Sequence, residues 1–162
     1  MIEIEIVEKK ETDEEWIRNA VRNEWHSDMV IIKGRKVHPA EFDALIALKN
    51  SERVGFLTYR ISGTQCAILT LNSFMKRQGI GSRLIDYLEE KLLQKDCNML
   101  EIATTNDNVE ALAFYQKLGF KIAAIQVNAM EHARKKKPSI PRTGLHGIPI
   151  RDEIILTKDL QE

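Results

Sequence analysis

The sequence predicts an α/β fold in which a mixed, mostly antiparallel sheet is flanked by helices, in one domain of residues 1–162. Three observations support this fold class. The chain is 43% hydrophobic and 30% charged, a composition typical of a globular domain. Apolar residues recur with the period of a strand in some segments and with the period of a helix in others. These segments follow one another in the order strand, helix, three strands, helix, strand, helix, strand.

The first forty residues contain one clear strand and one clear helix. In residues 2–6 isoleucine alternates with glutamate, which is the period of a strand with one buried face. Residues 12–15, Thr-Asp-Glu-Glu, have the form of a capping box, and apolar residues at helical spacing follow. A helix is therefore expected to continue to residue 25. After it we expect a short strand at residues 29–32 and otherwise irregular chain up to residue 41.

The middle of the chain predicts an antiparallel meander and then a helix. Three apolar runs, at residues 44–48, 54–61 and 66–71, are separated by turn-rich segments of hairpin length. Residues 79–95 then carry Ile, Leu, Tyr, Leu and Leu on one stripe, which indicates an amphipathic helix.

The last third of the chain alternates strands and helices and ends in a turn-rich loop and a strand. We expect a strand at 99–104, a helix at 108–118, a strand at 120–127, a short basic helix at 128–137 that Pro138 stops, a loop at 139–149 and a strand at 154–156. Gly119 follows the second of these helices, where a left-handed C-terminal cap is expected.

Composition excludes several classes of protein. The 24 Lys and Arg balance the 24 Asp and Glu. The chain therefore lacks the net charge that is typical of a dedicated nucleic-acid or membrane-surface binder. No apolar run approaches the length of a membrane span, and the N-terminus lacks the pattern of a secretory signal. Cys66 and Cys97 have no partner at metal-ligand spacing. We expect a cytoplasmic protein without a metal site.

The most specific local feature is the segment Lys-Arg-Gln-Gly-Ile-Gly-Ser at residues 76–82, between an expected strand and an expected helix. Glycines there let backbone N–H groups approach an anion, and the N-terminus of the helix adds partial positive charge. A phosphate or pyrophosphate is the ligand that such a turn favours. The alternative is that Gly79 and Gly81 only form a tight turn. The segment matches neither of the two best-known phosphate-binding motifs.

A second motif makes the first one more specific. Residues 108–120 have the pattern Asn-x-x-Ala-x-x-Phe-Tyr-x-Lys-x-Gly-Phe. Taken alone, this is a helix with one buried face. Together with the glycine turn about 30 residues earlier, it resembles the GNAT superfamily of acetyl-CoA-dependent N-acetyltransferases, whose order of elements is also similar. Residues 69–73, 104–108 and 147–153 further resemble a bacterial subgroup of that superfamily.

The resemblance implies acetyl-CoA as acetyl donor and assigns residues to it. The family's first motif begins with Arg or Gln, whereas this chain has Lys76 there. The family's pyrophosphate cradle would correspond to Arg77, Gln78, Gly79, Ile80, Gly81 and Ser82. Its pantetheine-binding strand would correspond to Leu69, Thr70 and Leu71, and its helix-borne Asn to Asn108. The acceptor would be a small-molecule or peptide amine, and because relatives often form dimers, a homodimer is compatible with the resemblance.

The implied chemistry, attack of a neutral amine on a thioester, needs a proton acceptor, a donor to the developing oxyanion and an acid for the thiolate. Tyr115 corresponds to the family's acid, and the alternative is a packing role. A backbone N–H near Leu71 or Asn72 is expected to serve the oxyanion. Glu101 is the candidate base, although an ordinary solvent-facing glutamate fits equally well. His38 and His26 lie in the irregular region that shapes the family's acceptor pocket, and His38 is the candidate acceptor contact, although an exposed loop histidine often has no function.

Two rival interpretations stay open at this point. An acyl-CoA-binding regulatory protein with weak or no turnover is the first, because no base is firmly identified. The second is a nucleic-acid module that uses the run of four basic residues at 134–137. Such a run is usually a solvated helix face, and no aromatic residues are interleaved with it, which argues against single-strand binding.

Overall fold

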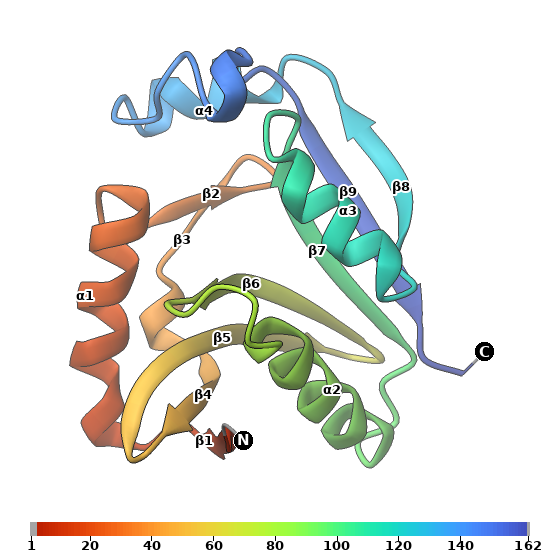
Figure 1. Ribbon diagram of the computed structural model, residues 1–162. Coiled ribbons are helices and arrows are strands. Elements are labelled where there is room, and N and C mark those ends of the chain that lie inside the picture. Colours follow the sequence, from red (N-terminus) through yellow and green to blue (C-terminus); the bar gives the residue numbers. More distant parts are fainter. Residues whose placement is uncertain (1–2, 162) are drawn as a thin grey trace.

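The computed structural model describes residues 3–161, and its centre is a seven-stranded mixed sheet with the order β1-β4-β5-β6-β7-β9-β8 (Figure 1). Only β6 and β7 pair in parallel; the other neighbours in the sheet are antiparallel. The strands are β1 (Glu5–Glu8), β4 (Asp43–Lys49), β5 (Glu52–Ser62), β6 (Gln65–Ser73), β7 (Met99–Thr105), β8 (Lys121–Gln126) and β9 (Glu153–Asp159). The fold class predicted from the sequence is confirmed.

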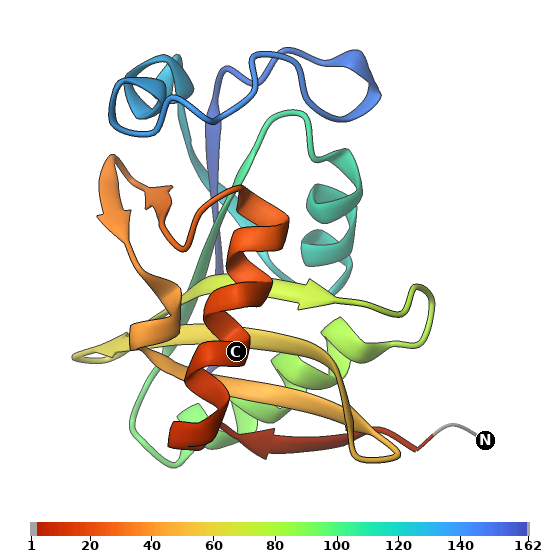
Figure 2. The ribbon, with the colours of Figure 1, turned by 90° about the vertical axis from the view of Figure 1, so that its left-hand side faces the viewer.

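In the described part of the chain, four α-helices surround the sheet: α1 (Glu14–Trp25), α2 (Ile80–Leu93), α3 (Val109–Lys117) and α4 (Ala129–Lys136). Helix α1 covers one face of the β1–β6 half and α2 the opposite face, as the view from the side of α1 shows (Figure 2). Each face has its own buried cluster, one around Phe56 beneath α1 and a larger one around Leu84 and Leu88 beneath α2 and α3. Cys66 and Cys97 are buried free thiols in the larger cluster.

The N-terminal region differs from the expectation in its boundaries. The first strand, expected from residue 2, begins at Glu5, while residue 2 lies outside the described part of the chain; Ile4 and Ile6 still pack into the core. The predicted cap at Thr12 is wrong, because Thr12 lies inside a short 3-10 helix, Glu11–Asp13. The carboxylate of Asp13 instead accepts a 2.8 Å hydrogen bond from the N–H of Lys10.

Residues expected to be mostly irregular form a small hairpin. Strand β2 (Val30–Ile32) pairs antiparallel with β3 (Arg35–Val37), a strand that the sequence did not indicate. The turn contains Gly34 with a φ of +77°. This hairpin projects from the end of α1 toward β7 in the far half of the sheet (Figure 1).

The C-terminal segment returns to the sheet next to its edge strand β8. Strand β8 follows α3, and Gly119 adopts the expected left-handed conformation with a φ of +98°. Helix α4 and a loop up to residue 152 then cross above the hairpin, after which β9 inserts between β7 and β8 (Figure 1). Within residues 3–161, no helix combines the length and the apolar character that a bilayer crossing requires.

Candidate active site

Strands β6 and β7 separate halfway along their length, and the V-shaped gap between them is the centre of the site (Figure 1). Their parallel pairing ends at Ile68 opposite Ile102. At the same point Leu69 is skipped in the register between β6 and β5. Leu69 is therefore an extra residue, a β-bulge, and bulges bend a strand and increase its twist. Residues 69–73 consequently keep β5 on one edge, while the edge toward β7 has no partner strand.

The turn after β6 exposes a row of backbone N–H groups. The N–H groups of residues 77–82 donate no hydrogen bond to any residue that the structure describes. Gly79 has a φ of +71°, and no atom lies within 4 Å of where its Cβ would be. At Gly81 a Cβ would lie 3.1 Å from Cζ of Phe114. Gly79 thus allows the left-handed backbone of the turn and leaves the space beside it open, and Gly81 allows α2 to approach α3. Free amides at a helix N-terminus form a site suited to a phosphate.

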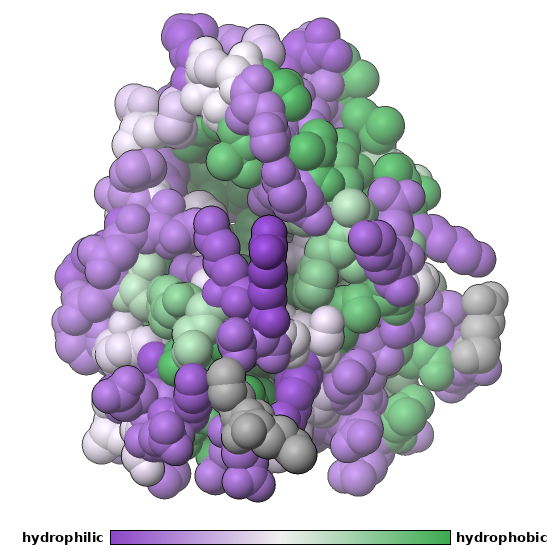
Figure 3. Space-filling view, viewed as in Figure 1, coloured by the Kyte–Doolittle hydropathy of each residue, from purple (hydrophilic) through white to green (hydrophobic). Residues whose placement is uncertain are grey.

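Two cavities meet at the gap. One, of about 360 Å³, extends from the free edge of β6 toward the hairpin and α4. The other, of about 660 Å³, lies over the turn at residues 76–81. Leu71, Asn108 and Ala111 line both, so the two cavities form one trough. We call the first the inner cavity and the second the turn cavity. On the face drawn in Figure 3 the surface is hollowed below the segment that carries α4, and apolar residues lie along the upper wall of the hollow.

Tyr115 lines the inner cavity from α3. Its ring packs edge-on against Phe114 and Phe120, with centroids 5.3 and 5.6 Å away. The side chain is buried, and burial raises the pKa of its phenol. The hydroxyl makes no hydrogen bond with the part of the chain that the structure describes. The phenol therefore keeps its proton at neutral pH and has no internal acceptor for it.

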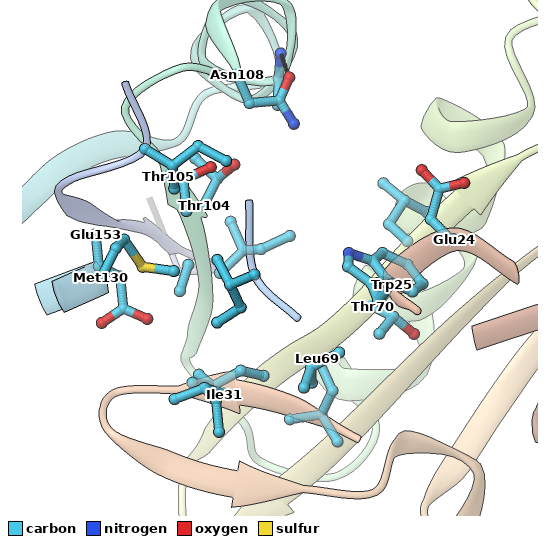
Figure 4. A pocket seen from close by; sticks show the side chains of 18 of the residues that line it. Glu24, Trp25, Ile31, Leu69, Thr70, Thr104, Thr105, Asn108, Met130 and Glu153 are labelled. Carbon is cyan, nitrogen blue, oxygen red and sulfur yellow. Dashed lines mark hydrogen bonds between the residues drawn. The ribbon is translucent and has the colours of Figure 1, made fainter. Parts of the chain in front are cut away.

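Asn108 lies at the junction of the two cavities (Figure 4). It is the N-cap of α3, where its Oδ1 accepts a 3.2 Å hydrogen bond from the N–H of Ala111. This cap fixes the side chain in the trough. Asn72 lies opposite Phe56 on β5. Its buried Nδ2 has no acceptor among the described residues, and its side chain lines neither cavity.

Glu101 and His38, which were predicted from the sequence, also lie outside both cavities. Glu101 is still in the paired part of β7, opposite Ala67 and before the strands separate. Its carboxylate forms a 2.7 Å ion pair with Nζ of Lys33. His38 is half exposed beside Asp28, 4.0 Å from its carboxylate. The roles predicted for Glu101 and His38 stay predictions, and the structure does not bring either side chain to the gap.

Four ionisable residues line the inner cavity, and sequence reasoning had named only one of them, His26, as a site candidate. Glu24 and His26 come from the end of α1, Lys137 from the end of α4, and Glu153 from the start of β9. For Glu24, Lys137 and Glu153 no local signal existed, because only the order of strands and the return of the C-terminal segment place them together. His26 was a weak candidate in the irregular region and reaches the cavity as the left-handed C-cap of α1.

The C-terminal segment is fastened over the inner cavity by polar contacts. The side-chain Oδ1 of Asn106 accepts hydrogen bonds from the N–H groups of both Arg151 and Asp152, each 3.0 Å long. The buried carboxylate of Asp107 accepts a 3.0 Å bond from the N–H of Leu145. A side chain at Gly144 would collide with that carboxylate. The stretches at 104–108 and 147–153, which the sequence singled out separately, therefore bind each other.

Only half of the basic run at 134–137 is a solvated helix face. The interpretation is wrong for Arg134 and Lys137, which make contacts inside the protein. The guanidinium of Arg134 donates to carbonyls of Ile140, Pro141 and Ile150. Lys137 is buried and donates to two carbonyls near the end of α1. Only Lys135 and Lys136 are exposed. The run holds the C-terminal segment against α1 and the hairpin, which removes the main reason for a nucleic-acid surface.

Comparisons with known proteins agree with this architecture. The model of the Acetyltransferase (GNAT) family matches residues 6–120. The uncharacterized protein YdhI of Bacillus subtilis (strain 168) is 38% identical over 154 residues, which cover 94% of this chain and 96% of that protein. The IAA acetyltransferase from Bacillus cereus ATCC 14579 has a similar structure, with a TM-score of 0.71 at 18% identity over 97% of this chain and 99% of that one. A GNAT family acetyltransferase from Elizabethkingia anophelis, solved with acetyl-CoA bound, gives 0.68 at 21% identity over 96% and 97%.

Proposed function

The chain belongs to the GNAT acetyltransferase family, and from that premise we propose that it transfers the acetyl group of acetyl-CoA to the amine of an acceptor molecule. The observation that carries the proposal is the single trough formed where β6 leaves β7. The trough joins a free strand edge to a row of free amides.

The residues of the trough fit the two polar parts of acetyl-CoA. The free edge of β6 at residues 69–71 offers backbone N–H and C=O groups at strand spacing, which suit an extended chain with amide groups such as pantetheine. The amides of residues 77–82 suit the pyrophosphate, because they lack internal acceptors and Gly79 leaves the space open. Asn108 lies between these regions. When bound, acetyl-CoA supplies a thioester whose carbonyl carbon an amine can attack.

Two groups of this chain are proposed to stabilise the transfer. The backbone N–H of Leu71 or Asn72, on the part of β6 without a second partner strand, donates to the oxygen that becomes negative as the amine adds. Tyr115 gives its proton to the departing thiolate. Its burial in the inner cavity, its raised pKa and its hydroxyl without an internal partner support this role.

A thiol-release assay tests the proposal. The protein is incubated with acetyl-CoA and a panel of primary amines, peptides and aminoglycosides, and the products are identified by mass spectrometry. We expect release of one thiol for each acetylamine formed. Calorimetry with acetyl-CoA alone separates the rival interpretation: an acyl-CoA-binding regulatory protein binds the donor and releases no thiol with any acceptor. Absence of binding contradicts both interpretations.

A further inference from the structure

Glu153 carries a buried negative charge without a counter-charge. It is 6% exposed and lines the inner cavity (Figure 4). Its Oε2 accepts a 3.0 Å hydrogen bond from the backbone N–H of Lys33. The ammonium of Lys33 pairs with Glu101 instead. Within residues 3–161, Oε1 of Glu153 accepts no hydrogen bond and no cation lies within ion-pairing distance of the carboxylate.

The other buried acids are compensated, which makes Glu153 an exception. Asp13 pairs with the guanidinium of Arg53. Asp152 binds the guanidinium of Arg151 through both oxygens and also accepts from a backbone N–H. Asp107 has no cationic partner among the described residues either, but its carboxylate accepts from two donors, a threonine hydroxyl and a backbone N–H. A buried carboxylate with one donor is costly in a folded protein, so an uncompensated one that faces a cavity points to a ligand that brings the positive charge.

The rest of the inner cavity indicates the polarity and the size of the remainder of that ligand. Many of its lining residues are apolar, and those that the hairpin, α4 and the loop after it contribute include Val30, Ile31, Met130, Ile140 and Ile150. At about 360 Å³ it is near the lower limit of ligand pockets. The loop fastened by Asn106 and Asp107 forms its roof, which limits the size of the acceptor.

The charges at the cavity do not favour an anionic group on the ligand. Glu24 and Glu153 contribute two carboxylates, and His26 lies exposed at the end of α1. Among the described residues that line the cavity, the ammonium group is that of Lys137, and it already donates hydrogen bonds to the carbonyls of Trp25 and Met29, 2.6 and 2.7 Å away. A carboxylate on the acceptor would therefore meet two negative charges and one cation that is engaged elsewhere.

We propose that Glu153 binds the ammonium group of the acceptor and takes its first proton, and that the acceptor is a small amine with an apolar body and no anionic group. This inference rests on the proposed acetyltransferase function. The ammonium gives one proton to the Glu153 carboxylate, and the resulting lone pair attacks the thioester carbon. The C–N bond forms and the C–S bond breaks. The nitrogen loses a second proton as the amide forms, the thiolate gains one, and Glu153 returns its proton to solvent.

The test uses matched pairs of amines that differ by one carboxylate: 3-methylbutylamine with leucine, and 2-phenylethylamine with phenylalanine. For the wild type we expect kcat/KM to be at least about tenfold higher for the member without the carboxylate. In the Glu153→Gln variant kcat/KM for the amine should fall about 10²-fold or more, the range for loss of a positioned base. The KM for acetyl-CoA should not change. Glu52→Gln, at an exposed position at the start of β5, is the matched control and should behave as the wild type.

A binding measurement keeps the test independent of turnover. In the presence of CoA, the affinity of 2-phenylethylamine, measured by NMR titration, should fall about ten- to hundredfold in Glu153→Gln, as expected for loss of a charged hydrogen bond. The affinity of the uncharged 2-phenylethanol should stay the same. Equal amine affinity in the two proteins overturns the role of Glu153, and a preference for leucine or phenylalanine overturns the acceptor class.

The outcomes separate this inference from the proposed function. If the wild type acetylates amines but Glu153→Gln acetylates them equally well, the acetyltransferase proposal stands and the role of Glu153 is wrong. If the wild type acetylates no amine in the panel, the proposed function fails, and the NMR titration alone decides whether Glu153 recognises an ammonium group.

Discussion

Replacing Tyr115 by Phe removes one hydroxyl from the inner cavity and leaves the rest of the side chain in place. The ring contacts with Phe114 and Phe120 do not involve the hydroxyl. Because that hydroxyl has no hydrogen-bond partner among the described residues, no internal group is left unsatisfied, and the free energy of unfolding should change by less than about 1 kcal/mol. Turnover should fall, because the only acidic proton at this position is lost.

The size of the loss follows from the chemistry of the leaving group. Positioned acid catalysis contributes about 10²- to 10⁴-fold. A thiol has an unperturbed pKa of about 8.5, so its thiolate leaves readily and the lower end applies. We therefore expect kcat to fall about tenfold to a hundredfold. Because burial raises the pKa of Tyr115, the phenol stays protonated up to at least pH 10, and the wild type should not lose this contribution below that pH.

Three measurements together decide the role of Tyr115. Steady-state thiol release gives kcat, calorimetry gives the affinity for acetyl-CoA, and urea denaturation gives the free energy of unfolding. A lower kcat with the other two unchanged supports the proton donor. Unchanged kcat at pH 7 and above would refute it, and Tyr115 would then be a packing residue. A large loss of stability would show that the hydroxyl has a structural partner.

The remaining predictions concern the turn, the basic run and an acid at the roof of the cavity. Gly79→Asp should weaken acetyl-CoA binding at least about tenfold in calorimetry, whereas the isosteric, neutral Gly79→Asn should bind much more tightly, because both residues tolerate a positive φ and only Asp repels phosphate. Lys137→Met should lower the free energy of unfolding in urea by about 2–4 kcal/mol, because two partly buried carbonyls lose their donor, while Lys135→Met at an exposed position should have little effect. The Arg151 guanidinium and the N–H of Asn128 hold the pKa of Asp152 below its usual value. The wild type should therefore lose this stabilisation as the pH falls below about 4, and Asp152→Asn should be less stable at pH 7 with a flatter acid limb in thermal unfolding.

Local patterns in the sequence were sufficient for most of the secondary structure. The three runs of the meander became β4, β5 and β6, and the stripe at 79–95 became α2. These predictions succeed because burial of one face imposes a period of two or 3.6 residues wherever a segment packs on a core. The cap at Thr12 failed because the choice of cap depends on contacts a few residues away, here between Asp13 and Lys10.

The family motifs also belong to what the sequence alone could give. The glycine turn and the helix that carries Tyr115 lie on the trough, and both keep local signals: a positive φ at Gly79 and an N-cap at Asn108. The sequence could not show that Gly81 is needed for the approach of Phe114 rather than for the turn itself, because that contact joins two separate helices.

The proposed acceptor side, the inner cavity, depends on tertiary structure alone. Strand β9 inserts between β7 and β8, and this order places Glu153 beside the hairpin, 120 residues away in sequence from its donor Lys33. The basic run holds the C-terminal segment in place because Lys137 donates hydrogen bonds to carbonyls more than 100 residues away in sequence. A periodic pattern reports which face of an element is buried, but not which other element covers it. The identity and charge of the inner cavity therefore depend on long-range packing that the sequence pattern does not record.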